Sequence, residues 1–294
     1  MTGRIVRRVQ LTADTFEWEV EAGALARAAR PGQFVMVRLH DGSERIPLTL
    51  ADFDAVRGVV TLVVLAAGKS TREMMAATEG TVLGSLAGPL GLPSEIPSLE
   101  RVTLVGGGLG VAPLYPQVKA FRAAGARVAV VLGFRTGSRV FWADRLAAAC
   151  DELHLVTEDG SCGEAGQVTD VVARLLATRA CGERVVAIGP LAMMRACAEL
   201  TRGAGIPTVV SLNPIMVDGT GMCGSCRVLV GGRLRFACVE GPEFDGHAVD
   251  FDDLALRQPR FRAEECAGLE RWQHECRLVA AADATEHAED RKDR

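Results

Sequence analysis

A regular alternation of strand-like and helix-like runs between residues 101 and 212 constrains the fold of this chain more than any other feature. The strand-like runs are short and rich in Val and Leu, and the runs between them repeat apolar residues with helical spacing. Strand character is found at 101–105, 127–134, 152–157, 184–188 and 208–212, and helical character at 111–124, 140–149, 167–177 and 191–202. This order is typical of a doubly wound α/β domain built on a parallel sheet.

The residues before this region follow a different pattern, in which short extended runs are separated by turn dipeptides such as Pro31-Gly32. These runs lie at 4–11, 15–20, 33–38, 48–54 and 58–64, and a short helix is expected at 71–77. Strands at this spacing predict an all-β domain, either a barrel or a sandwich.

The 294 residues therefore divide into four segments, because the pattern changes again after residue 212. We expect a β domain at 1–98, an α/β domain at 99–212 and a small Gly- and Cys-rich domain at 213–260. Residues 261–294 predict a helical extension over 261–281 that ends in a polar, disordered tail.

Charge and hydropathy narrow the class of protein. The formal net charge is −4, which disfavours a nucleic-acid-binding role because such proteins carry a basic surface. The longest apolar runs, such as 59–67, are far shorter than the ~20 residues of a membrane-spanning helix, and the N-terminus has no apolar signal core. We therefore expect a cytoplasmic protein with no membrane span.

Three of the nine cysteines, Cys223, Cys226 and Cys238, lie within sixteen residues. In a reducing compartment such crowding indicates a metal site and not disulfides. Cys-x2-Cys places two thiolates on one tight turn, and the third returns after a predicted hairpin. A 2Fe–2S cluster needs four ligands, commonly cysteines, and Asp218 stands upstream where no cysteine is found. Zinc is the alternative, since three cysteines with one Asp or with His247 would also satisfy it.

The remaining six cysteines are scattered along the chain and predict small buried side chains or inert surface thiols. They are Cys150, Cys162, Cys181, Cys197, Cys266 and Cys276.

A glycine-rich loop joins the first strand of the α/β region to its first helix. Glycine permits a close approach of the backbone to a phosphate, and the following helix N-terminus offers free N–H groups. The residues expected to bind are Gly107, Gly108, Leu109 and Gly110. The acid that usually follows the second strand is missing, and Arg135 and Arg139 occur there instead. A tight turn without a ligand is the alternative.

Three further motifs have weaker individual signals. Arg45 precedes an extended run and could pair with a pyrophosphate, although it could also be an ordinary exposed arginine. Gly68, Lys69, Ser70 and Thr71 precede a helix, where they form either an anion site or a plain N-cap.

The third of these motifs lies at another crossing from strand to helix. Gly189, Pro190 and Met193 are expected at the carboxyl edge of the parallel sheet, where ligands bind in open α/β folds. An ordinary crossover turn with Met193 and Met194 in the core is the alternative.

Taken in order, these motifs resemble the ferredoxin–NADP+ reductase superfamily. They are most similar to the branch containing the electron-transfer subunits of dihydroorotate dehydrogenase and the small subunits of NADH-dependent ferredoxin:NADP+ oxidoreductase, an electron-bifurcating transhydrogenase. The latter are also called sulfide dehydrogenase β subunits. The resemblance covers roughly residues 4–260 and is most specific at 213–227 and 237–246. Asp218 is the feature that favours the transhydrogenase group, since the dihydroorotate group has a cysteine there.

This resemblance implies an N-terminal antiparallel FAD-binding β-barrel, an NAD(P)-binding α/β domain and a C-terminal 2Fe–2S domain. It implies that Arg45 holds the FAD pyrophosphate, although Pro47 stands where some relatives have an aromatic residue. Pro47, Leu48 and Thr49 would line the isoalloxazine, and residues 68–71 would cradle phosphate. NAD(H) or NADP(H) would dock on residues 107–110 and near Gly189, and relatives of the small subunit imply NAD(H).

The function implied is that of an NAD(P)H-dependent oxidoreductase subunit that passes electrons between a nicotinamide, FAD and the cluster. No acid–base dyad is required, so no catalytic side chain is predicted. A larger flavo-iron–sulfur subunit would be the partner and would reach ferredoxin. A subunit of dihydroorotate dehydrogenase or of another flavoprotein complex is one alternative, and a zinc-containing nucleotide-binding regulatory protein is another. The helix at 261–281 would be a docking element or simply a solvated helix.

Overall fold

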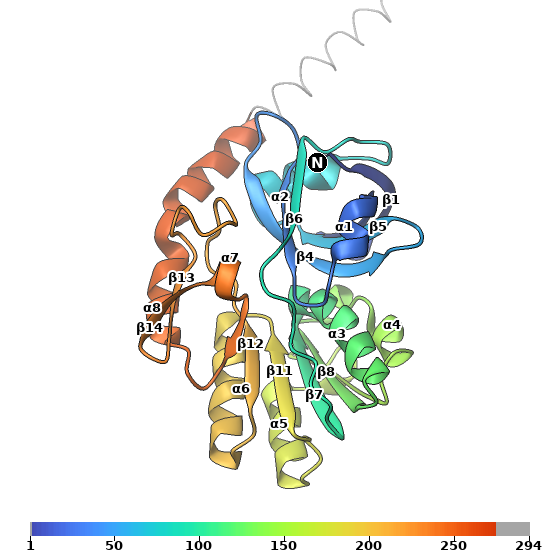
Figure 1. Cartoon of the computed structure of the whole chain (residues 1–294), viewed down its shortest axis with the longest axis vertical. Helices are drawn as coiled ribbons and strands as arrows, with labels where there is room; N and C mark the ends of the chain where they lie inside the picture. Colours follow the sequence, from blue (N-terminus) through green and yellow to red (C-terminus); the bar gives the residue numbers. More distant parts are fainter. Residues whose placement is uncertain (1, 275–294) are drawn as a thin grey trace, which may run out of the picture.

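The structure is a computed structural model, and residues 2–274 are described here. Three parts are arranged around a central linker, with a β-barrel above a parallel sheet and a smaller cysteine-rich part beside both (Figure 1). The extended linker of residues 91–100 runs from the barrel into the sheet. The predicted combination of antiparallel and parallel sheets is confirmed.

The N-terminal part is a six-stranded antiparallel sheet with the strand order β1-β2-β5-β4-β3-β6. Its elements are β1 (Arg4–Gln10), β2 (Thr15–Glu21), α1 (Gly23–Ala28), β3 (Phe34–Arg38), β4 (Arg45–Asp54), β5 (Val59–Leu65), α2 (Lys69–Ala76) and β6 (Ser85–Leu90). The backbone of β1 also bonds to residues 80–83, which lead into β6, so the sheet closes into a barrel. Alternate residues such as Phe16, Trp18 and Val20 fill its interior.

The second part is a parallel sheet with the order β10-β9-β8-β7-β11-β12, extended by the antiparallel strand β15. Its elements are β7 (Arg101–Gly107), α3 (Val111–Ala123), β8 (Arg127–Phe134), α4 (Ala143–Ala147), β9 (Glu152–Thr157), β10 (Glu164–Ala165), α5 (Val168–Ala177), β11 (Arg184–Ile188), α6 (Leu191–Ala204), β12 (Thr208–Ser211) and β15 (Glu243–Asp245). Short 3-10 turns η1 (Gly108–Gly110) and η2 (Gly137–Arg139) follow β7 and β8. The strands are apolar runs because helices cover both faces of the sheet.

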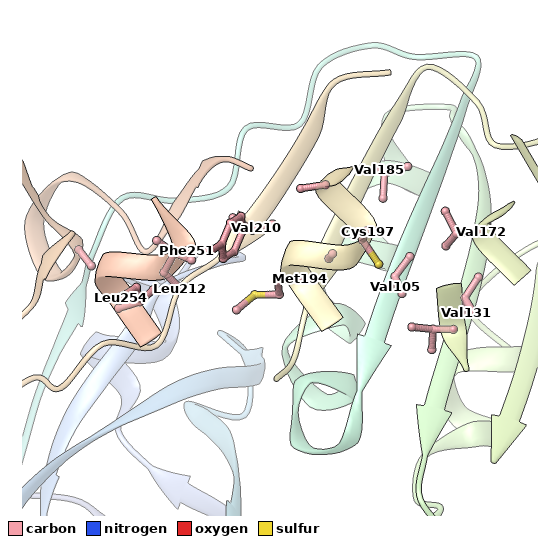
Figure 2. Close-up of a cluster of buried hydrophobic side chains, with 14 of the residues drawn as sticks. Val105, Val131, Val172, Val185, Met194, Cys197, Val210, Leu212, Phe251 and Leu254 are labelled. Atoms are coloured by element: carbon pink, nitrogen blue, oxygen red, sulfur yellow. The ribbon is translucent and has the colours of Figure 1, made fainter. Parts of the chain in front are cut away.

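The third part consists of the hairpin β13 (Arg227–Val230) and β14 (Arg233–Phe236), the turn α7 (Ala237–Glu240), α8 (Phe251–Arg257) and η3 (Gln258–Phe261). Residues 262–274 are helical and mostly exposed, and the remainder of the predicted helix at 261–281 lies outside the described residues. The core of the α/β part continues into this region, where Leu212, Phe251 and Leu254 extend the cluster that contains Val105 and Met194 (Figure 2).

One predicted helix begins in the wrong place. The pattern predicts a helix over 140–149, whereas α4 begins at Ala143, Val140 is extended and Phe141 lies outside the helix. Phe141 packs against Phe134 with ring centroids 5.7 Å apart, which draws it into the core and delays the helix. Within residues 2–274, no helix is long and apolar enough to span a bilayer.

Candidate cofactor sites

The nucleotide loop lies at the point where the strand order of the parallel sheet reverses. The chain proceeds from β7 to β8 and β9 on one side and then returns to place β11 on the other side of β7. Gly107 ends β7 and the 189–193 turn follows β11, so the two predicted nucleotide motifs meet at the carboxyl edge of adjacent strands. Open α/β sheets bind ligands at such switch points.

Steric contacts show how closely these motifs approach each other. A Cβ atom added at Gly107 would lie 2.5 Å from Sδ of Met193 and 2.9 Å from Cδ of Pro190. At Gly110 an added Cβ would lie 2.1 Å from the carbonyl oxygen of Ile188. Gly108 has a positive φ of 53° and no heavy atom within 4 Å of such a Cβ, so its backbone is open to a phosphate. The residues present therefore fit a dinucleotide pyrophosphate at the start of α3.

The two predicted FAD motifs are also brought together, although they lie more than twenty residues apart in the sequence. Arg45 begins β4 and is exposed, and Ser70 of α2 donates a hydrogen bond of 2.7 Å to Glu44, the residue before Arg45. The Thr71 hydroxyl accepts hydrogen bonds of 3.0 Å from the backbone N–H groups of Ala67 and Gly68. This contact caps α2, as the alternative interpretation of the motif predicts.

The strand after Arg45 places its side chains on two sides. Leu48 is buried in the barrel core, whereas Pro47 and Thr49 on the opposite face are partly exposed. A flat ring against this strand would therefore meet the side chains of Pro47 and Thr49 and only the backbone of Leu48.

Arg72 is a candidate phosphate-binding residue that sequence reasoning missed. Its Nε atom is buried without a hydrogen-bond partner in the described residues, and Arg72 lies in the first turn of α2. A buried guanidinium nitrogen without a partner is costly unless a ligand satisfies it. The sequence feature that could have indicated Arg72 is its position directly after the predicted anion site at residues 68–71. Together with the open backbone at Gly68, this arginine fits an anionic group at the start of α2.

The predicted cluster ligands lie on one loop and the turn that returns to it. The Sγ atoms of Cys226 and Cys238 are 3.2 Å apart, and Asp218 accepts hydrogen bonds from the backbone N–H groups of Thr220 at 2.7 Å and Cys223 at 2.6 Å. The loop turns through glycines with positive φ, at 78° for Gly219, 85° for Gly221 and 68° for Gly224.

The environments of these ligands differ. Hydrogen bonds from Ser225 lower the pKa of the exposed Cys223 thiol, and the backbone N–H of Thr220 lowers the pKa of Asp218. Burial raises the pKa of Cys238 to about 12, and the adjacent Cys226 adds to this effect. A bound metal reverses such a shift, because thiols bind metal as thiolates.

The four predicted ligands do not form a closed shell as they stand. No three His, Cys, Asp or Glu side chains among residues 2–274 are gathered tightly enough to hold a metal ion. The structure pairs Cys226 with Cys238 and links Asp218 to the backbone of Cys223. His247, the possible zinc ligand, is instead 3.0 Å from the hydroxyl of Thr201 on α6. Three thiols and a carboxylate on one loop fit an iron–sulfur cluster by donor chemistry.

The scattered cysteines behave largely as predicted where they are described. Cys150, Cys181 and Cys197 are buried, Cys162 is partly exposed and Cys266 is exposed, while Cys276 lies outside the described residues. Burial raises the pKa of Cys197 to about 12, which makes it unreactive.

Comparison with known proteins agrees with this geometry. The iron-sulfur cluster binding domain of dihydroorotate dehydrogenase B matches residues 213–250. A Thermotoga maritima protein described as a dihydroorotate dehydrogenase B (NAD(+)) electron transfer subunit homolog is 46% identical over 268 residues, covering 91% of this chain and 94% of the relative. The dihydroorotate dehydrogenase B (NAD(+)) electron transfer subunit of Fusobacterium nucleatum is 31% identical, covering 84% and 97%.

Among solved structures, a chain of the NADH-dependent reduced ferredoxin-NADP oxidoreductase, solved to study flavin-based electron bifurcation, superimposes with a TM-score of 0.87. It is 44% identical, and the match covers 92% of this chain and 98% of that chain.

These matches confirm the predicted class, which is a ferredoxin reductase-like oxidoreductase subunit that transfers electrons through a flavin and an iron–sulfur centre. Within that class, the chain belongs to the family of dihydroorotate dehydrogenase B electron-transfer subunits and their homologues. The family and the fold support FAD, a 2Fe–2S cluster and NAD(H) as its cofactors.

Proposed function

We propose that this chain is the small subunit of an electron-bifurcating NADH-dependent ferredoxin:NADP+ oxidoreductase. Bound FAD would exchange a hydride, as two electrons and one proton, with NAD(H) and single electrons with the 2Fe–2S cluster. In this proposal Arg45, Pro47, Thr49 and residues 68–71 hold FAD. Residues 107–110, with Gly189, Pro190 and Met193, hold the nucleotide, and Asp218 completes a cluster shell with the three cysteines.

One packing contact carries the proposal. A Cβ atom added at Gly219, next to Asp218, would lie 2.7 Å from Cγ of Met36. Met36 on β3 pairs directly with Pro47 on β4, which is the strand of the flavin motif. The cluster loop therefore packs on the strand that pairs with the flavin strand, while η1 of the nucleotide loop contacts β5 on the other side of β4. The proposed flavin strand lies between the nucleotide loop and the cluster loop.

A partner is proposed because apolar side chains next to the predicted cluster ligands are exposed. Val217, Met222 and Val239 each adjoin a predicted ligand and are 51%, 89% and 44% exposed. Exposed apolar side chains beside such ligands support a protein-binding surface there. We propose that a larger flavo-iron–sulfur subunit covers it and passes electrons to ferredoxin. The cytoplasm is the proposed location, because the site needs free thiols.

Asp218 and the solved structure that matches 92% of this chain support the electron-bifurcating branch of the family. An electron-transfer subunit of dihydroorotate dehydrogenase is the second candidate, favoured by the match at residues 213–250. The two candidates differ in the partner and in the final electron acceptor.

Anaerobic co-expression of this chain with each kind of partner subunit tests the proposal. We expect a stable complex with the larger flavo-iron–sulfur subunit, with flavin absorbance and broad visible iron–sulfur bands. The complex should reduce NADP+ only when NADH and reduced ferredoxin are both supplied. A complex that forms only with the dihydroorotate-oxidising subunit would establish the second candidate, and a colourless, zinc-containing protein would contradict both.

A further inference from the structure

A cluster of charged and aromatic side chains joins the barrel to the α/β part. Arg145 of α4 donates a hydrogen bond of 2.7 Å to Asp52 of β4, and its guanidinium lies 3.8 Å from Glu17 of β2. The same guanidinium lies 4.1 Å from the ring centres of Tyr115 and Trp142. Arg145 is therefore held by two carboxylates of one part and two aromatic rings of the other.

Lys119 strengthens the same junction from α3. Its ammonium group forms an ion pair with Asp52 and lies 4.7 Å from the ring centre of Tyr115. Asp52 therefore receives one cation from α3 and another from α4. Helix α3 lies directly against β4 of the barrel (Figure 1), and α4 reaches the barrel through the side chain of Arg145.

The backbone at this junction is strained. Trp142 is not a glycine, yet its φ of 56° and ψ of 13° place it in the left-handed region. Its indole N–H donates a hydrogen bond of 3.0 Å to the carboxylate of Glu17, which is buried. A bulky residue keeps such a conformation only when its surroundings hold it there. The contact with the barrel supplies that restraint.

The junction is linked by rigid elements to both proposed cofactor sites. Asp52 lies three residues beyond Thr49 on β4, and Tyr115 lies five residues beyond Gly110 on α3. Apolar packing continues the link, because Ala51 and Val63 of the barrel share a core with Val111 and Leu114. A rotation at the junction would therefore move the flavin strand relative to the nucleotide loop.

We propose that Arg145 is a positioning residue for hydride transfer. Its bonds to Asp52 and Glu17 and its stacking on Tyr115 and Trp142 set the orientation of the barrel against α3, and with it the distance between nicotinamide and flavin. This inference depends on the flavin and nucleotide sites proposed above. The rate of hydride transfer depends strongly on the relative position of donor and acceptor, and a displacement of 1 Å can lower it by a factor of about 100.

The test is stopped-flow reduction of the FAD-loaded, purified complex by NADH, comparing wild type with Arg145→Met. This change keeps the aliphatic stem and removes the charge and the planar group. We expect the limiting rate of flavin reduction to fall about tenfold while the apparent dissociation constant of NADH changes less than twofold. Hydrogen exchange without nucleotide should increase in α4 and in the second half of β4.

Arg122→Met is the matched control. Arg122 forms an ion pair of 3.3 Å with Asp151, and both residues belong to the α/β part, so the pair does not cross the junction. This variant should keep the wild-type rate. Equal limiting rates in the two variants would overturn the proposal, as would a loss in Arg145→Met that follows only a loss of bound flavin.

Asp52→Asn alone covers the case in which Arg145→Met folds poorly, since it should also lower the limiting rate of flavin reduction. Where both single variants fold, a double-mutant cycle tests whether the two residues act together. Asp52→Asn is nearly isosteric and removes the same ion pair from the barrel side. If the pair acts as a unit, the double variant should be no slower than the slower single variant. If the double variant lost the product of the two single losses in the limiting rate of flavin reduction, the proposal would be overturned. A wild-type complex whose flavin is not reduced by NADH would instead refute the proposed function.

Discussion

At the scale of single residues, the backbone conformation and the space around each position explain why the nucleotide loop needs glycines. Gly108 needs glycine for its positive φ, whereas Gly110 has an ordinary helical φ of −61° and needs glycine only because Ile188 lies so close. Sequence inspection treats these glycines as one motif, yet the structure gives them separate physical reasons.

A prediction follows for Gly110. The Cβ of Gly110→Ala would meet a backbone carbonyl, which cannot rotate away, so β7 and β11 must separate slightly. We expect a loss of about 2 kcal/mol in unfolding free energy, measured by chemical denaturation, together with weaker NADH binding.

Gly203→Ala is the control for this substitution. Gly203 lies in α6 with no heavy atom within 4 Å of the added Cβ, so alanine should be neutral or stabilise the chain by up to about 1 kcal/mol. Equal unfolding free energies for Gly110→Ala and Gly203→Ala would contradict the prediction, because the nucleotide loop would then accommodate the added Cβ without loss of stability.

At the scale of elements, the short strand β15 ties the three parts together. Its first residue, Glu243, accepts hydrogen bonds from Ser94 of the linker at 2.8 Å and from Gln117 of α3 at 2.7 Å. Burial raises the pKa of Glu243 to about 6, although these hydrogen bonds and the charge of Arg184 act in the opposite direction. The Oε1 atom of Gln117 is buried without a partner in the described part of the chain.

The pKa of Glu243 gives a pH-dependent stability. The folded-state pKa lies above the ordinary value of 4.5, so the folded chain retains the proton longer than the unfolded chain does. The stabilisation of the folded state by protonated Glu243 is therefore complete below about pH 4.5 and is lost as the pH rises through about 6. The loss amounts to about 2 kcal/mol, from 1.36 kcal/mol per pKa unit.

Glu243→Gln should remove this dependence. The amide can still contact Ser94 and can donate to the free oxygen of Gln117, so we expect the variant to be more stable than wild type at pH 7 by up to about 2 kcal/mol. Denaturant unfolding between pH 4.5 and 7 measures this. Glu264→Gln on the exposed helix is the control and should follow the wild-type curve. If the unfolding free energies of Glu243→Gln and wild type changed in parallel with pH, Glu243 would not be the source of the pH dependence.

At the scale of the whole molecule, one packed core connects the parts that electrons must cross. Phe34 and Met36 of the barrel share this core with Val105 of the sheet and with Cys226 and Cys238 of the cluster loop. The cluster loop packs directly on β3, the neighbour of the proposed flavin strand, so the distance between them is set by close packing.

Removing one predicted cluster ligand should therefore stop electron delivery to the partner and leave flavin reduction by NADH intact. Cys226→Ser should abolish the visible iron–sulfur bands and slow electron delivery to the partner at least about a hundredfold, because a ligand substitution disrupts the cluster. NADH should still bleach the flavin absorbance at the wild-type rate in a single turnover, since the nucleotide loop contacts β5, on the other side of the proposed flavin strand β4 from the cluster loop. Cys162→Ser, outside the ligand set, should retain both steps. An intact cluster spectrum in Cys226→Ser would refute this ligand assignment.

Local pattern was sufficient for much of the fold. The extended runs of the barrel and the alternation from residue 101 onward predicted most of the strands and helices, because burial of one or both faces leaves a period in the sequence. The three residues of β15 are too few to show a period. The start of α4 was also beyond prediction, since only the contact of Phe141 with Phe134 decides it.

The amino-acid sequence by itself determined which candidate binding groups this protein carries. Glycine at a strand-to-helix turn, arginine before an extended run and three closely spaced cysteines are each recognised as candidates from residue type and spacing. Tertiary structure decided which of these groups meet. It placed Gly107 against Met193, Gly219 against Met36, and Arg145 between Asp52 and two rings. Such contacts join residues far apart in the chain, and only packing of the three parts into shared cores specifies them.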